Sequence, residues 1–202
     1  MTLKILVEKL ARSSKKFTTD SEIKEDCKKL SISYYTAIRY LISNKHLARV
    51  FKGIFYIYSL EERKLGKSEM NLYKILAEAI KLKGIKKWYL GLETSLKLNN
   101  LTHEYFTIEF VLNDKIFRAK PITIMGKKVK FYKISPKLMN QGIFFKNYPF
   151  SNPEKTALDL FYLRHYDFSN FEELAEKLNK KKLKEYSKNY DKRTIKAVES
   201  LK

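Results

Sequence analysis

Residues 33–43 place several hydrogen-bonding side chains at helical spacing. Apolar residues between them repeat every three or four positions, which predicts a helix with one buried face. The residues of the opposite, outward face are Tyr35, Thr36, Arg39, Tyr40 and Ser43. An arginine can bond to a guanine edge, whereas tyrosine and threonine suit phosphates and thymine methyl groups. This face therefore predicts contacts in the major groove of DNA, with Arg39 as the base-reading residue.

The charge around this helix favours the same chemistry. Between Asp26 and Glu61 the sequence has no acidic residue. The residues expected to contact DNA beside the outward face are Ser33, Lys45, His46, Arg49 and Lys52. His46 follows the helix, where a protonated imidazole suits the helix dipole. Two alternatives stay open: a very basic chain has basic windows by chance, and the same elements can serve protein contacts alone.

The whole chain is strongly basic. Its 202 residues include 42 Lys and Arg against 22 Asp and Glu, a formal charge of +20. Such a surplus favours an anionic partner. Hydrophobic residues make up 44% of the chain, so a folded core is expected. No apolar run approaches the roughly 18 residues of a membrane-spanning helix, and no signal peptide is evident, so we expect a soluble, cytoplasmic protein without a membrane partner.

A second basic region lies at the end of the sequence. Residues 177–202 contain ten basic residues against three acidic ones. The candidates for a second anion-binding surface are Lys180, Lys181, Lys182 and Lys184. The alternative, equally supported, is that these charges form the solvated face of two helices.

Few residues have the types and spacing that catalysis needs. Cys27 is the only cysteine, and there is neither a phosphate-binding loop nor a dinucleotide fingerprint. Lys155 and Asp159 share one face of a predicted helix, where a buried ion pair explains them better than an active site does. We therefore expect no enzyme activity, no cofactor and no metal. The alternative is a nuclease or another nucleic-acid-processing enzyme, with the candidate carboxylates Glu93, Glu109, Glu154 and Asp159.

The elements that must position the DNA-contacting helix follow from the periodicity of residues 1–62. In order, they are a helix at 3–10, an extended piece at 17–18, a helix at 23–30 opened by a Thr19–Glu22 capping box, a helix at 34–42, and β-rich runs at 47–51 and 54–58. The Lys52-Gly53 pair between the last two runs predicts a hairpin turn. This order is that of a winged helix-turn-helix DNA-binding domain. A polar stretch at residues 61–70 predicts a linker after it.

Residues 69–202 mix helices and strands, so the chain is expected to be α+β with two domains. Strands predicted near residues 106–112, 116–124 and 129–134 would form a small antiparallel sheet. Asn152-Pro153 opens a helix, with asparagine as the cap and proline in the first turn. Because that helix is apolar almost all round, we expect it in the core, with further helices following it.

Three segments resemble AbiEi-type antitoxins of type IV toxin–antitoxin systems and related transcriptional regulators. They are Lys52-Gly53-Ile54-Phe55-Tyr56, residues 89–102 beginning Tyr89-Leu90-Gly91-Leu92, and Pro153-Glu154-Lys155-Thr156-Ala157-Leu158-Asp159-Leu160, which is similar to a Pro-Glu-Lys-x-x-x-Asp helix. Asn44-Lys45 and Asn99-Asn100 stand where the family often has glycine. Asparagine tolerates the left-handed conformation, so both turns are expected to survive.

The resemblance implies a DNA-binding autorepressor whose C-terminal antitoxin-like domain opposes a nucleotidyltransferase-like toxin. The implied DNA partner is a double-stranded operator, with inverted repeats as one option, bound by a monomer or a weak dimer. A winged-helix transcription factor with no toxin partner and a nucleic-acid chaperone without regulation stay as alternatives.

Overall fold

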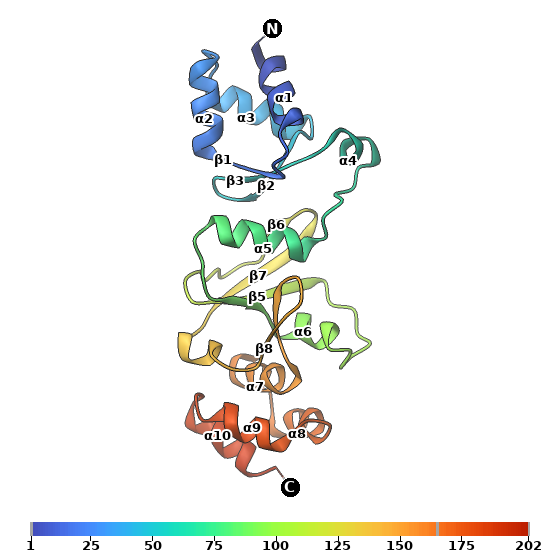
Figure 1. Cartoon of the computed structure of the whole chain (residues 1–202). Helices are drawn as coiled ribbons and strands as arrows, with labels where there is room; N and C mark the ends of the chain where they lie inside the picture. The colour runs from blue at the N-terminus through green and yellow to red at the C-terminus, as the bar shows by residue number, and fades with distance from the viewer. Residues whose placement is uncertain (1, 165, 202) are drawn as a thin grey trace. The chain divides into compact units, whose positions relative to one another are not determined.

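The computed structural model describes residues 2–164 and 166–201, and within them the chain is α+β. Helices and strands follow one another along the chain, and the strands form two separate sheets (Figure 1). The expected fold class is confirmed at this level. In the described part, no helix is both long and apolar enough to cross a membrane.

Contacts divide the chain into two compact units. The first comprises the residues up to Gly84 together with Ile124–Gly126, and the second comprises Ile85–Thr123 and the residues from Lys127 onward. The polar stretch at residues 61–70 lies inside the first unit. Helix α5 (Leu72–Leu82), which follows that stretch, therefore belongs with the N-terminal elements.

Three helices build the core of the first unit: α1 (Thr2–Arg12), α2 (Asp20–Lys29) and α3 (Tyr34–Ser43). Helix α2 begins with the predicted capping box, in which the Thr19 hydroxyl accepts from the Glu22 backbone and the Glu22 carboxylate accepts from the Thr19 backbone. Apolar residues from all three helices meet in one buried cluster. Its members include Leu6, Ile23, Cys27, Ala37 and Leu41.

A three-stranded antiparallel sheet completes this core. Strands β1 (Phe17–Thr19), β2 (Leu47–Phe51) and β3 (Ile54–Ile57) lie in the order β1-β3-β2. The predicted turn joins β2 to β3, and Gly53 in that turn has a φ of +80°, which glycine adopts at no steric cost. The sheet contributes Leu47, Phe55 and Ile57 to the helical cluster.

The opposite face of this sheet is covered by α5. The helix packs against β2 and β3, so every residue of β3 is buried. Tyr56 of β3 donates a hydrogen bond to the buried Glu62 carboxylate of α4 (Leu60–Leu65). That carboxylate also accepts from the backbone of Ser59 at 2.7 Å and of Glu69 at 2.8 Å. These bonds fix the polar stretch to the sheet, which explains why it does not behave as a linker.

The second unit is built on a six-stranded sheet. Its strands are β4 (Trp88–Leu90), β5 (Ile108–Asn113), β6 (Ile122–Ile124), β7 (Lys127–Lys133), β8 (Ile143–Phe145) and β9 (Pro149–Ser151), in the order β6-β7-β5-β4-β9-β8. The prediction of an antiparallel sheet was wrong, because β7 runs parallel to β5 and β9 runs parallel to β4. Of the strand predicted at residues 116–124, only Ile122–Ile124 form one, which is β6, and residues 114–121 form a loop. The strand that pairs with β5 is therefore β7, which follows the loop and β6 in the sequence.

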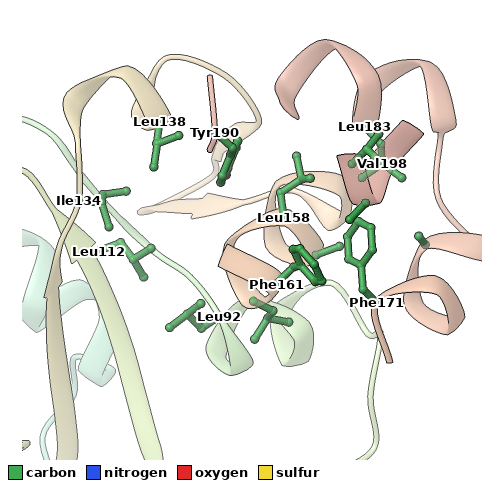
Figure 2. Packing of buried hydrophobic residues seen from close by; sticks show 14 of the residues in the cluster. Leu92, Leu112, Ile134, Leu138, Leu158, Phe161, Phe171, Leu183, Tyr190 and Val198 are labelled. Carbon is green, nitrogen blue, oxygen red and sulfur yellow. The ribbon is translucent and has the colours of Figure 1, made fainter. Parts of the chain in front are cut away.

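Helices complete the second unit. They are α6 (Glu93–Leu98), α7 (Pro153–Arg164), α8 (Phe168–Glu176), α9 (Lys180–Ser187) and α10 (Lys192–Glu199), with a short 3-10 helix at Pro136–Met139. The predicted core helix is confirmed as α7, in which every residue from Glu154 to Phe161 is buried. Leu158 and Phe161 of α7 pack in one apolar cluster with Phe171 of α8, Leu183 of α9 and Val198 of α10 (Figure 2).

Candidate nucleic-acid interface

Helix α3 is held in place by its apolar face. Ala37, Ile38 and Leu41 are buried, and the helix packs against α2 and β2. Ser33 precedes the helix, but its side chain makes no capping hydrogen bond, and the residue is exposed. The first turn of α3 contains no acidic residue. No carboxylate in the first turn of α3 therefore neutralises the positive end of the helix dipole.

The outward face of α3 is the one that the sequence predicted. All five of its predicted residues are exposed: Tyr35, Thr36, Arg39, Tyr40 and Ser43. Tyr35 is 81% exposed. The face thus presents a guanidinium, hydroxyl groups and aromatic surface on one rigid helix.

Tyr34 is half-buried and anchors the start of α3. Its hydroxyl donates a hydrogen bond to the Asp20 carboxylate, and the Lys24 ammonium lies 5.2 Å from its ring centroid. Burial and the Asp20 carboxylate raise the pKa of Tyr34 to about 12, so the hydroxyl stays protonated and donates. The Tyr35 ring packs edge-on against Tyr34, with 5.5 Å between the ring centroids. Helix α2 therefore fixes the position of α3 and of Tyr35.

His46 supports Tyr40 from the chain that follows α3. The two rings stack with 6.1 Å between centroids and 19° between planes. Burial, and then the positive charge of Arg63, lower the pKa of His46. The neutral imidazole is therefore favoured near pH 7.

Three exposed basic residues lie beyond the end of α3: Lys45, Arg49 and Lys52. In the Asn44-Lys45 pair, Lys45 is the residue that adopts the left-handed conformation, with a φ of 54°. The Arg49 guanidinium lies 5.6 Å from the centroid of the Phe55 ring. Lys52 is in the β2–β3 turn, whose Gly53 carbonyl accepts from the Asp20 backbone at 3.0 Å. The turn is therefore tied to the start of α2.

We define the α3 surface as the exposed residues Ser33, Tyr35, Thr36, Arg39, Tyr40, Ser43, Lys45, Arg49 and Lys52. Among the ion pairs within residues 2–164 and 166–201, none uses a basic residue of this surface. Asp20 precedes the acid-free residues 27–60, and its carboxylate accepts a hydrogen bond from the Tyr34 hydroxyl. The α3 surface therefore offers uncompensated positive charge to a partner.

The second set of predicted anion-binding residues lies on α9, in the second unit. Lys180, Lys181, Lys182 and Lys184 are all exposed, whereas Leu183 on the opposite face is buried. Asn179 caps the helix, because its side chain accepts from the Lys182 backbone at 3.1 Å. The lysines thus form an outward face, which we call the α9 surface.

Three carboxylates of the enzyme alternative each have a hydrogen-bonding or ion-pair partner of their own. Glu93 pairs with Arg164 at 2.9 Å, and Glu109 pairs with Lys97 at 2.7 Å. Glu154 is buried, and its carboxylate accepts from the Asn179 backbone at 3.4 Å. In the part of the chain that the structure describes, no group of three or more His, Cys, Asp or Glu residues could hold a metal ion.

Asp159, the fourth of these carboxylates, lies in a buried polar cluster. Its Oδ1 lies 2.6 Å from the Lys155 ammonium and accepts from the Tyr190 hydroxyl at 2.6 Å, and its Oδ2 accepts from the Tyr89 hydroxyl at 2.7 Å. Burial lowers the pKa of Lys155 and raises those of Tyr89 and Tyr190 well above the ordinary tyrosine value. The predicted buried Lys155–Asp159 pair is confirmed.

Close packing seals this cluster. A Cβ atom at Gly142 would lie 2.7 Å from the Lys155 Cβ, so only glycine fits against the lysine. Lys155 is 1% exposed and Asp159 is fully buried. The cluster therefore joins elements of the second unit, and its two charged groups are shielded from solvent.

Two residues that complete these arrangements escaped sequence reasoning. Tyr190 lies 35 residues from Lys155, and Asp20 lies 14 residues from Tyr34. In neither pair do the partners lie on the same element, so the periodicity of one helix or strand does not connect them. A buried lysine needs hydrogen-bond acceptors, which signals that partners exist but does not say which residues they are.

No family model and no curated protein matches this chain. Among solved structures, the RV2827C protein from Mycobacterium tuberculosis is similar, with a TM-score of 0.62 and 11% sequence identity. The similarity covers 99% of this chain and 75% of that chain. The chain thus shares the fold of that protein along nearly its whole length.

Proposed function

We propose that the chain is a sequence-specific, DNA-binding transcriptional regulator whose first unit is a winged helix-turn-helix domain. The observation that carries this proposal is the α3 surface, where uncompensated basic and aromatic side chains stand on a helix fixed by its opposite face. The order of elements in the first unit supports it. In this interpretation α2 and α3 are the helix pair, and the β2–β3 hairpin is the wing.

The proposed contacts divide into base reading and backbone binding. An α-helix fits the major groove of B-DNA, where Arg39 can donate two hydrogen bonds to a guanine. Tyr35 and Thr36 lie on the same exposed face and suit thymine methyl groups or phosphates. The Ser33 hydroxyl lies at the start of α3, where helix backbone N–H groups attract a phosphate.

The basic residues beyond α3 bind the DNA backbone in this proposal. Lys45, Arg49 and Lys52 are exposed and flank the helix on the chain that forms β2 and its turn. Such contacts set the affinity and its salt dependence but carry no sequence information. His46 acts through Tyr40, which it holds by stacking.

The test separates these two roles by substitution. Duplexes enriched from a random pool by the wild-type chain supply the specific ligand. We expect Arg39→Ala to weaken binding to them by about 1–3 kcal/mol and to relax the preference at one base pair. Lys52→Ala should weaken binding to all sequences alike and reduce the salt slope by about one unit. Fluorescence anisotropy at several salt concentrations measures both effects.

Arg12→Ala is the matched control, because Arg12 is an exposed arginine of α1 outside the α3 surface. It should bind the enriched duplexes as the wild-type chain does. If no sequence is enriched, or if Arg39→Ala keeps full affinity at equal salt, the proposed role of α3 is wrong.

We infer further that this regulator is the autorepressing antitoxin of a type IV toxin–antitoxin pair. The support is the position of two segments that resemble the AbiEi family. Tyr89 from one and Lys155 and Asp159 from the other meet in the same buried cluster. The proposed partners are a double-stranded operator and a nucleotidyltransferase-like toxin. The α9 surface is the proposed working surface against the toxin, because such an enzyme handles polyanions.

A further inference from the structure

The longest acid-free stretch of the sequence is residues 115–153, which apart from Ile124–Gly126 belong to the second unit. Residues 115–153 contain nine lysines and arginines and no aspartate or glutamate. This stretch is longer than the window between Asp26 and Glu61 that surrounds α3. It includes the loop of residues 114–121, apart from Asp114, and the whole of β7. Seven of the nine basic residues lie between Lys115 and Lys133, on the loop and on β7, next to the β6 edge of the six-stranded sheet, so positive potential is concentrated there.

The side chain of Asn113 gives the loop a fixed shape. Asn113 is 1% exposed, and its amide nitrogen donates to the carbonyls of Ile116 at 2.9 Å and Tyr132 at 3.1 Å. Its amide oxygen accepts from the Lys115 backbone at 2.9 Å. The Arg118 backbone then donates to the Phe131 carbonyl of β7 at 3.2 Å. Because these hydrogen bonds already order the loop, binding of a ligand does not carry the entropy cost of ordering it.

Phe117 projects from this ordered loop and is 62% exposed. The Lys130 ammonium lies 5.8 Å from the Phe117 ring centroid and 5.6 Å from that of Tyr132. The Arg164 guanidinium lies 5.8 Å from the Tyr132 ring centroid and pairs with the Glu93 carboxylate at 2.9 Å. It therefore supports the Tyr132 ring, and the phosphate contacts fall to the lysines and Arg118. Phe117, Lys130, Tyr132 and Arg164 thus form a row in which rings and cations alternate. We call this row the Phe117 platform.

We propose that the Phe117 platform binds single-stranded nucleic acid. An exposed ring among cations can stack on an unpaired base while the cations contact the phosphates on either side. Arg118 and Lys120 are exposed on the same loop as Phe117, so phosphate partners lie next to the stacking ring. The loop is already ordered before a ligand binds. Because every base has an aromatic face on which the ring can stack, we expect little sequence preference.

The chemistry of the platform selects this ligand over other polyanions. In a duplex, neighbouring base pairs cover the faces of each base, so Phe117 could not stack without opening the helix. A duplex would use the lysines and arginines of the loop but not the ring. The inference goes beyond the proposed function, which assigns duplex DNA to the first unit.

The experiment uses the full chain and labelled strands of about 15 nucleotides, of DNA and of RNA, without self-complementarity. Phe117→Ala should weaken binding to the single strand by about tenfold, and Phe117→Trp should retain it. Binding to the duplexes enriched by the wild-type chain should not change. Phe145→Ala is the matched control, because Phe145 is 76% exposed on β8 at the opposite edge of the sheet.

The outcomes distinguish the ring from general charge. A loss with Phe117→Ala alone supports the platform, and a loss confined to DNA or to RNA also identifies the strand it takes. Equal losses for single strand and duplex would show that the loop binds backbone only, and would overturn the proposal. Unchanged affinity, or an equal loss with Phe145→Ala, would overturn it too. None of these results depends on Arg39, so a failure here leaves the proposed function standing.

Discussion

At the scale of single residues, the buried cluster around Lys155 shows how charge can organise a unit. Tyr89 belongs to β4, Lys155 and Asp159 to α7, and Tyr190 precedes α10. Their hydrogen bonds therefore join the sheet, the core helix and the C-terminal helices. Buried charges are costly by themselves and are tolerated when both partners and their hydrogen bonds are present.

Removing one charge of the Lys155–Asp159 pair should lower the free energy of unfolding more than removing both charges does. Asp159→Asn leaves the Lys155 ammonium buried without its counter-charge, so we expect the free energy of unfolding to fall by about 3–5 kcal/mol. The double change Lys155→Met with Asp159→Leu removes both charges and should be the more stable of the two variants. Urea unfolding followed by circular dichroism measures both. A double variant as unstable as Asp159→Asn would contradict this account of the cluster.

At the scale of elements, the start of α2 is positioned by Glu22. The Lys15 side chain, followed by the Thr19 backbone and the Thr18 hydroxyl, lowers the pKa of Glu22 to about 2, although partial burial works against this. The Lys15 ammonium lies 2.8 Å from the Glu22 carboxylate. The Asp20–Tyr34 hydrogen bond joins α2 to α3, so the cap at the start of α2 also supports the position of the proposed DNA-binding helix.

The depressed pKa of Glu22 predicts a specific loss of stability in acid. The carboxylate stabilises the fold fully above its ordinary pKa of 4.5, and this contribution disappears as the pH falls towards about 2. Glu22→Gln should therefore lower the thermal midpoint at about pH 6 and make it less sensitive to acid below about pH 4.5. Thermal unfolding at a series of pH values measures this. Glu8→Gln, at an exposed glutamate of α1, is the control and should keep the wild-type dependence.

The elements that sequence reasoning located are those whose signals are local. Helix α3 has one apolar face, and α2 has a capping box, so periodicity and spacing were sufficient. The Lys52-Gly53 pair marked its turn because glycine takes the positive φ found there. The outward face of α3 follows from the same register, which is why all five of its predicted residues are exposed.

The elements that sequence reasoning missed depend on distant contacts. The parallel pairing of β5 and β7 depends on the path of residues 114–121, which the side chain of Asn113 directs. Helix α5 joins the first unit because it covers β2 and β3, and its own sequence does not show which sheet it meets. The Phe117 platform likewise combines a loop, a strand and the end of α7.

At the scale of the whole molecule, positive charge is spread over both units. Residues up to Gly84 contain 18 basic and 9 acidic residues, and the remaining residues contain 24 and 13. General attraction to a polyanion is therefore shared by the two units, whereas the proposed specific contacts are local. Comparing variants of equal net charge is the way to separate these effects, because screening over about 10 Å at 0.1 M salt leaves only nearby charges effective.

The antitoxin proposal predicts that neutralisation and DNA binding use different surfaces of the full chain. The measurement is growth rescue on co-expression with a nucleotidyltransferase-like toxin encoded beside this chain, with protein levels checked. Reversing the α9 surface with Lys180→Glu, Lys181→Glu and Lys182→Glu should abolish rescue, because these exposed lysines face solvent and their loss spares the core. Reversing the exposed Lys64, Lys67 and Lys74 of the first unit gives the same net charge and should leave rescue intact. Arg39→Ala should weaken operator binding and still rescue. Rescue by the α9 variant would exclude that surface, and absence of rescue by the wild-type chain would favour a transcription factor that has no toxin partner.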